Sequence, residues 1–188
     1  MRSCAKVYVG FLMLAAAMAS CAHVAGDVPG QSPAGNEAVF DATPVVAGLN
    51  ENTYFALGNA SLKIKRFKEA KGYFLKAIGL NPTRPEFYNN LAWTYMEEGD
   101  YKRAEERIKE AIALGAERPY AYLDTYGVIS MRMGAVRDAE ERLLTALSLA
   151  PPEDKKAQAH ILRHLLELYA KTGDKDSAKE IEQRLRGF

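Results

Sequence analysis

From residue 51 onward, apolar and polar positions follow a helical period, and the whole pattern returns at an interval of about 34 residues. Large apolar side chains and small ones keep the same order in three successive copies: Tyr54, Leu57, Gly58, Ala70, Phe74 and Ala77; Tyr88, Leu91, Ala92, Ala104, Ile108 and Ala111; Leu123, Tyr126, Gly127, Ala139, Leu143 and Ala146. A constant interval of this length is typical of stacked helix pairs. The sequence therefore predicts an all-α solenoid.

Turn signals divide this region into eight predicted helices. Asn81-Pro82 ends one helix, because the residue before a proline is pushed out of the α region. Gly99-Asp100 and Gly173-Asp174 supply a left-handed residue followed by an N-cap, and Gly134 acts in the same way. The predicted helices cover residues 51–64, 67–80, 85–98, 101–114, 120–133, 136–149, 154–171 and 175–186. No segment alternates with a period of two, so we expect no strands.

The small side chains are expected where two helices cross closely, since a larger group would push the helices apart.

The helix pairs form four predicted repeats, over about 51–84, 85–118, 120–153 and 154–188. The fourth copy is weaker: its alanine, Ala178, comes late, so extra residues around 151–155 lengthen the loop or the next helix. The last helix carries many charges, as a terminal cap facing water would.

These residues resemble the tetratricopeptide repeat over residues 51–188. The resemblance implies a right-handed superhelix of about four repeats, whose first helices line a concave groove that holds an extended peptide or a partner helix. Carried onto this chain, the groove face is Phe55, Asn59, Lys63, Asn89, Trp93, Glu97, Asp124, Val128, Arg132, Arg163 and Glu167. These residues follow one face of each helix.

Trp93 is the only tryptophan, and an exposed tryptophan in a groove is a common binding hot spot. The alternative is a ring buried between helix layers. Asn59 and Asn89 can pair with a ligand backbone, or only with neighbouring helices. The chaperone-tail version of the family clamps a terminal carboxylate with basic residues; the corresponding positions here hold Ala121 and Thr125, so we expect no such clamp.

The N-terminal 20 residues have the pattern of a secretory signal peptide. Arg2 and Lys6 precede an apolar run over residues 7–19, which is shorter than the ~20 residues that span a bilayer. The run ends in Met-Ala-Ser before Cys21, which resembles a bacterial lipobox and implies lipidation of Cys21. The residue after Cys21 is Ala22 rather than aspartate, and by the same resemblance this implies that the lipoprotein is sorted to the outer membrane. The alternative is an ordinary signal peptide with a coincidental cysteine.

Residues 21–50 are predicted to be a lipidated cysteine followed by a disordered linker, because glycine and proline interrupt any helical or strand period. Cleavage before Cys21 removes the other cysteine, Cys4, and lipid blocks Cys21, so the mature chain has no free thiol. The net charge of +1 gives no excess of positive charge of the kind that nucleic-acid-binding proteins use to contact phosphates.

Catalytic signals are few. His160 and His164 lie one helical turn apart with Glu167 nearby, a spacing that can bind zinc. Isoleucine follows His160, so no HExxH motif is present, and no remote ligand is evident. We interpret the pair as ordinary surface histidines. We find no activated nucleophile, phosphate loop or paired carboxylates, and therefore expect no enzymatic activity and no cofactor.

The leading hypothesis is a non-catalytic, lipid-anchored, periplasm-facing scaffold that binds a segment of an envelope protein. The family includes outer-membrane lipoproteins that pilot secretin rings of type IV pili, which favours a role in pilus or secretin assembly; others dock cell-wall hydrolases. A second hypothesis, from another class, is a metal-dependent periplasmic enzyme using His160, His164 and Glu167. A third is a structural subunit that oligomerises through its convex face.

Overall fold

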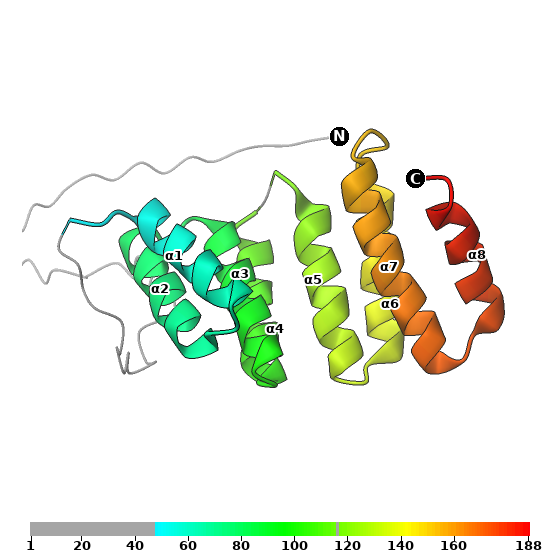
Figure 1. The fold of residues 1–188 in the computed structure, drawn as a ribbon, viewed down its shortest axis with the longest axis horizontal. Coiled ribbons are helices and arrows are strands. Elements are labelled where there is room, and N and C mark those ends of the chain that lie inside the picture. Colours follow the sequence, from blue (N-terminus) through cyan, green and yellow to red (C-terminus); the bar gives the residue numbers. More distant parts are fainter. Residues whose placement is uncertain (1–47, 116) are drawn as a thin grey trace, which may run out of the picture. The chain divides into compact units, whose positions relative to one another are not determined.

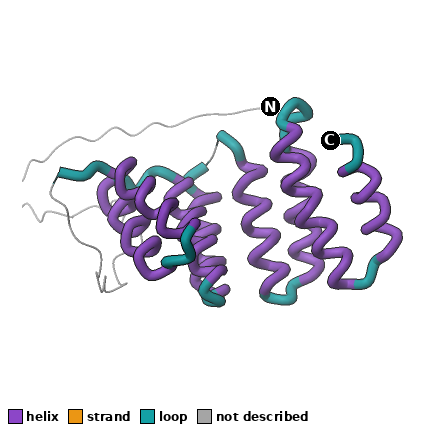
Figure 2. The backbone as a smooth tube through the Cα atoms, viewed as in Figure 1, coloured by secondary structure: helices purple, strands orange, loops and turns teal. Residues whose placement is uncertain are grey.

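The computed structural model describes residues 48–115 and 117–188, in which we find eight α-helices and no strand (Figures 1 and 2). The predicted signal peptide, Cys21 and nearly all of the predicted linker lie outside the described residues. The helices are α1 (Glu51–Lys63), α2 (Phe67–Leu80), α3 (Pro85–Glu97), α4 (Tyr101–Ala113), α5 (Pro119–Arg132), α6 (Val136–Leu149), α7 (Lys155–Thr172) and α8 (Lys175–Leu185). None of the helices in these two ranges is both long and apolar enough to cross a lipid bilayer.

The helix ends match the predicted boundaries to within one residue, and the predicted caps explain why. Asp100 and Asp174 each accept a hydrogen bond from the backbone N–H three residues on, at 3.2 and 3.1 Å. Gly99 and Gly173 precede these caps with φ angles of +85° and +77°, a region that glycine enters without strain. The long helix α7 begins after a further cap at Asp154.

The helices pack in chain order as four pairs: α1 with α2, α3 with α4, α5 with α6, and α7 with α8. Successive pairs meet through α2 and α3, α4 and α5, and α6 and α7. The first helices of the pairs also contact one another, α1 with α3, α3 with α5, and α5 with α7 (Figure 1). The predicted solenoid of helix pairs is therefore confirmed.

Small side chains lie where the helices of a pair cross, as the repeat pattern predicts. A Cβ atom added to Gly58 would lie 2.5 Å from the Phe74 ring, and one added to Gly127 would lie 2.6 Å from Leu143 Cγ. Ala70, Ala104 and Ala139 on the second helices are fully buried. Their counterpart on α8, Ala178, is only half-buried. The fourth pair therefore packs more loosely at this position, in line with its weaker match to the repeat.

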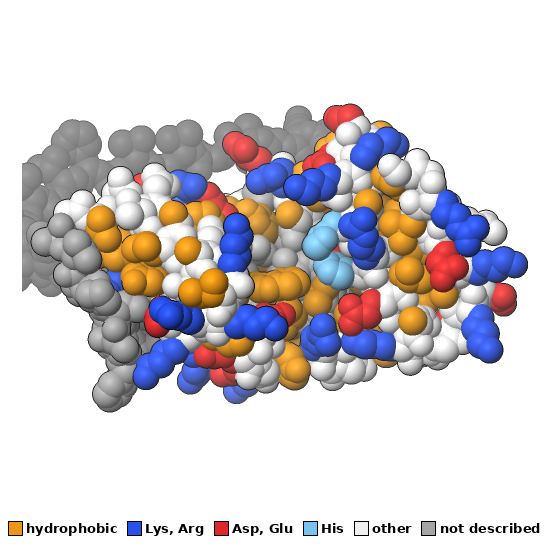
Figure 3. Space-filling view, viewed as in Figure 1, with side chains coloured by type: hydrophobic (Ala, Val, Ile, Leu, Met, Phe, Trp, Pro, Cys, Tyr) orange, Lys and Arg blue, Asp and Glu red, His pale blue; other side chains and the backbone are white. Residues whose placement is uncertain are grey.

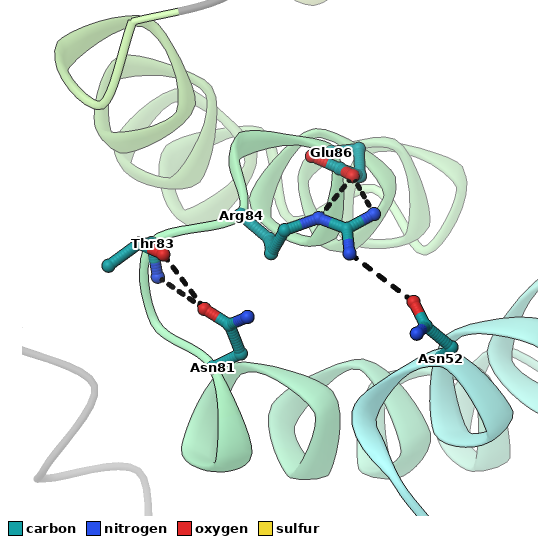
Figure 4. A network of polar contacts seen from close by, with 5 residues as sticks. All are labelled: Asn52, Asn81, Thr83, Arg84 and Glu86. Carbon is teal, nitrogen blue, oxygen red and sulfur yellow. Dashed lines mark hydrogen bonds and ion pairs between the residues drawn. The ribbon is translucent and has the colours of Figure 1, made fainter.

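A polar network joins the first repeat to the second at the α2–α3 loop (Figure 4). Arg84 donates from Nε to Glu86 Oε1 at 2.6 Å and from Nη1 to Asn52 Oδ1 of α1 at 3.3 Å. Burial is the largest single influence on the Glu86 pKa and raises it, but the hydrogen bond from Arg84, a backbone hydrogen bond and the nearby positive charges together hold the pKa below its usual value. Asn81 accepts from both the N–H and the hydroxyl of Thr83 and so fixes the turn.

Candidate functional site

The face formed by the first helices carries two recesses, which together we call the groove. Recess one lies between α1 and α3 and has a volume of about 480 Å³. Its wall is mostly apolar with a charged rim, made by Asn59, Leu62, Lys63, Lys65, Phe67, Trp93 and Glu97. Four of these residues, Asn59, Lys63, Trp93 and Glu97, were predicted groove residues.

Recess two lies between α3, α5 and α7 and has a volume of about 330 Å³. Its wall is Asn89, Trp93, Tyr120, Ala121, Asp124, Thr125, Ala157, His160 and Ile161. Figure 3 shows the two described histidines, in pale blue, near the centre of this face beside hydrophobic side chains. Asn89, Trp93 and Asp124 are among the predicted groove residues. Tyr120 is not, and α7 contributes Ala157, His160 and Ile161 instead of the predicted Arg163 and Glu167.

Trp93 lines both recesses. Its side chain is half-buried, packed against the core on one side and open to the groove on the other. The ring is therefore neither fully buried between helix layers nor free in solvent. A large, rigid, partly exposed ring at the junction of two recesses can contact a ligand that occupies either one.

The asparagine side chains form a chain across α1 and α3. Asn90 Nδ2 donates to Asn59 Oδ1 at 2.6 Å, and Asn89 Nδ2 donates to Asn90 Oδ1 at 3.1 Å. Asn59 therefore does bond to a neighbouring helix. The buried Asn89 Oδ1 accepts no hydrogen bond from the residues described, so it keeps an unused acceptor beside recess two.

The other predicted groove residues line neither recess. Phe55 packs its ring 4.9 Å from that of Phe87 and 5.9 Å from that of Phe74, so it joins the first repeat to the second. Val128 is 2% exposed and belongs to the core rather than to the groove face. Arg132 and Arg163 are exposed. The basic side chains at the third and fourth repeats are thus accessible, but they stand outside the two recesses.

A buried carboxylate meets two imidazoles in the wall of recess two. Asp124 of α5 is 5% exposed. Its Oδ1 lies 2.7 Å from His164 Nδ1, and its Oδ2 lies 3.6 Å from His160 Nε2. The interpretation of these histidines as ordinary surface residues is wrong for His164, whose side chain is only 14% exposed and tied to Asp124. A remote ligand-type residue, which the sequence did not reveal, is present after all.

His160 and Glu167 have different electrostatic surroundings. Burial and the nearby charge of His164 lower the pKa of His160, although Asp124 acts in the opposite direction. Glu167 does not join the cluster; it lies 2.8 Å from Lys171 Nζ and 3.7 Å from Arg132 Nη2. The hydrogen bond from Lys171 is the main reason that the Glu167 pKa lies below its usual value.

The comparison with known sequences agrees with this architecture. The family model for the tetratricopeptide repeat matches residues 61–123, which run from the end of α1 into α5. The chain carries tetratricopeptide repeats over these residues. It is 32% identical over 111 residues to the translocon at the outer membrane of chloroplasts 64 of Pisum sativum, a match that covers 58% of this chain and 18% of that protein. The chain spans about a fifth or less of the length of the curated relatives it matches.

Solved structures show the same fold. The structure of pilF from Pseudomonas aeruginosa has a TM-score of 0.63 at 24% identity, covering 72% of this chain and 60% of that chain. The first repeat domain of Spaghetti (RPAP3), bound to an HSP90 peptide, has a TM-score of 0.53 at 18% identity, covering 73% of this chain and 96% of that chain. Repeats of this family are protein-interaction modules and generally non-catalytic.

Proposed function

We propose that this protein is a non-catalytic scaffold whose groove binds an extended segment of a partner protein. The observation that carries the proposal is the position of Trp93, which lines both recesses on the face formed by α1, α3, α5 and α7. A segment that crosses the Trp93 ring can place one side chain in each recess. Aromatic anchors of this kind supply much of the binding free energy of an interface.

The chemistry of recess one favours an apolar anchor on the partner. Leu62 and Phe67 form the apolar wall beside Trp93. The rim carries charges of both signs, from Lys63, Lys65 and Glu97. Because both signs are present, the rim can pair with either sign of charge and gives little electrostatic selection. Selectivity in recess one therefore comes mainly from the fit of an apolar side chain.

We further propose that the scaffold is held in the bacterial outer membrane by lipid on Cys21, facing the periplasm, and that its partner belongs to the cell envelope. Support comes from the apolar run over 7–19 and the lipobox-like residues before Cys21. The fold shared with pilF of Pseudomonas aeruginosa is compatible with a pilus or secretin assembly as the machine it serves.

Trp93→Ala tests the groove. We expect it to weaken partner binding by about 2 kcal/mol, or roughly thirty-fold in affinity, because the variant removes the ring that both recesses share. Detergent-solubilised membranes are passed over immobilised wild type and variant, and the recovered proteins are quantified. Phe188→Ala, at an exposed ring at the end of the chain, is the matched control and retains binding. Equal recovery of proteins by wild type and Trp93→Ala would contradict the proposal that the partner binds in the groove around Trp93.

Cys21→Ser tests the anchor. The substitution is expected to abolish incorporation of labelled palmitate and to release the protein from membranes, because oxygen in place of sulfur leaves no thiol to be alkylated. Cys4→Ser is the control, since this residue lies inside the predicted signal peptide, and its labelling should match wild type. Labelling of Cys21→Ser at the wild-type level contradicts the lipobox.

A further inference from the structure

We propose that Asp124, His160 and His164 form a binding site for a divalent transition-metal ion of the zinc class, at the wall of recess two. The three side chains come from two helices, α5 and α7, of successive repeats. One nitrogen of each imidazole and one carboxylate oxygen all lie within 4.8 Å of one another. The site does not depend on the proposed peptide-binding function, and the two can fail separately.

The spacing of the ligand atoms suits an ion. Bonds of about 2.0–2.1 Å to zinc require ligand atoms roughly 3 to 3.5 Å apart. His164 Nδ1 lies 2.7 Å from Asp124 Oδ1, just below that range, and His160 Nε2 lies 3.6 Å from the other oxygen, Asp124 Oδ2, just above it. The imidazole centroids are 4.5 Å apart with planes at 70°, so the two rings converge edge to face on the same carboxylate. Side-chain rotations would be needed to bring all three ligand atoms within bonding distance of one ion, because the ligand atoms lie up to 4.8 Å apart.

The helical framework fixes the two histidines. His160 and His164 lie four residues apart on α7, which places both imidazoles on one helix face. Asp124 approaches from α5 and is held in place by burial. An ion bound here would link the third repeat to the fourth. Because this set supplies three ligands, at least one coordination position remains for water or for a partner's side chain.

The ligand chemistry selects the class of ion. Two imidazole nitrogens and one carboxylate oxygen suit zinc, copper, nickel or cobalt, whereas magnesium and calcium prefer oxygen ligands alone. Glu167, the ligand that the sequence suggested, is already paired with Lys171 and Arg132. The structure thus replaces Glu167 by Asp124 as the carboxylate of the set.

Isothermal titration with zinc chloride tests the site. The protein is the full chain carrying Cys4→Ser and Cys21→Ser, purified without a polyhistidine tag, so that no thiol or tag competes for the ion. We expect one equivalent of zinc to bind with micromolar or tighter affinity and magnesium to give no saturable heat. His160→Ala, His164→Ala and Asp124→Asn should each weaken zinc binding at least tenfold.

Two matched variants separate this site from adventitious binding. His23→Ala removes the remaining histidine of the chain, and Glu167→Gln removes the alternative carboxylate; both should bind zinc within about twofold of the parent. His160→Ala changes a side chain that is 59% exposed, and circular dichroism should show that it folds as the parent does. Absence of saturable zinc binding overturns the proposal, as does His160→Ala binding zinc like the parent, or Glu167→Gln losing as much affinity as the histidine variants.

Discussion

Gly127→Leu is expected to lower the free energy of unfolding by about 3 kcal/mol or more. A Cβ atom at this position would lie 2.6 Å from Leu143 Cγ and 3.3 Å from the backbone oxygen of Ala139. Leu143 and Ala139 are fully buried, so neither can move into solvent to relieve the clash. Overpacking of this kind costs about 1–3 kcal/mol for a modest insertion, and an isobutyl group exceeds that. Urea titration followed by circular dichroism measures the change.

Gly79→Leu is the matched control because it makes the same substitution in a helix where, apart from the adjoining residues and the helix's own backbone, no atom lies within 4 Å of the new Cβ. Leucine is the better helix former by about 0.8 kcal/mol, so this variant is expected to be as stable as wild type or slightly more so. The difference between the two variants isolates the steric term. If Gly127→Leu unfolds at the same urea concentration as Gly79→Leu, helix α5 does not cross α6 as closely as the structure shows.

The small residues at which the two helices of a pair cross could be predicted from the sequence, because the steric requirement is local and recurs along the chain. A crossing that admits only glycine or alanine recurs in the first three repeats, so Gly58, Ala92 and Gly127 stand out at intervals of 34 and 35 residues. Most helix boundaries were predictable for the same reason, because the break carries a glycine, proline or capping aspartate whose backbone preference does not depend on the rest of the fold. The break between α1 and α2 is the exception: it is Ile64-Lys65-Arg66, and Lys65 takes a left-handed φ of +59°.

The groove was only partly predictable, since its shape depends on how far each helix is rotated about its own axis. Counting four residues along α5 placed Val128 on the same face as Asp124, yet Val128 is buried in the core. The same counting missed the approach of α7 to α5, which brings His164 within 2.7 Å of Asp124. These two residues are 40 positions apart, and no local pattern connects them.

Phe55 was predicted to contact a ligand in the groove, but in the structure its ring packs against other aromatic rings. Its place on the face of α1 suggested the groove, but the ring fills the space between the first two repeats, against Phe74 of its own pair and Phe87 of the next. Phe87 did not stand out in the sequence because it falls one residue before the recurring Tyr88. In the structure Phe87 is fully buried and ties α1 to α3.

Phe87→Ala is therefore expected to cost about 3–5 kcal/mol of unfolding free energy, the usual range for removing a buried aromatic ring. The cavity would open beside Phe55, and Arg84 would lose the ring that its guanidinium overlies at 5.0 Å. Because each repeat contacts only its neighbours, the loss should fall mainly on the junction between the first and second pairs. Amide hydrogen exchange should then be faster in α1 and α2 than in α7.

Phe188→Ala serves as the control for this substitution, since that ring is 48% exposed and its removal leaves no internal cavity. Its hydrogen exchange in α1 and α2 should equal that of wild type. If Phe87→Ala instead accelerated exchange equally in all the described helices, the chain would unfold as one cooperative unit, and Phe87 would not be the specific tie between its first two repeats. Trp93 lies on α3 at the edge of that junction, so loosening α1 should also weaken partner binding through recess one.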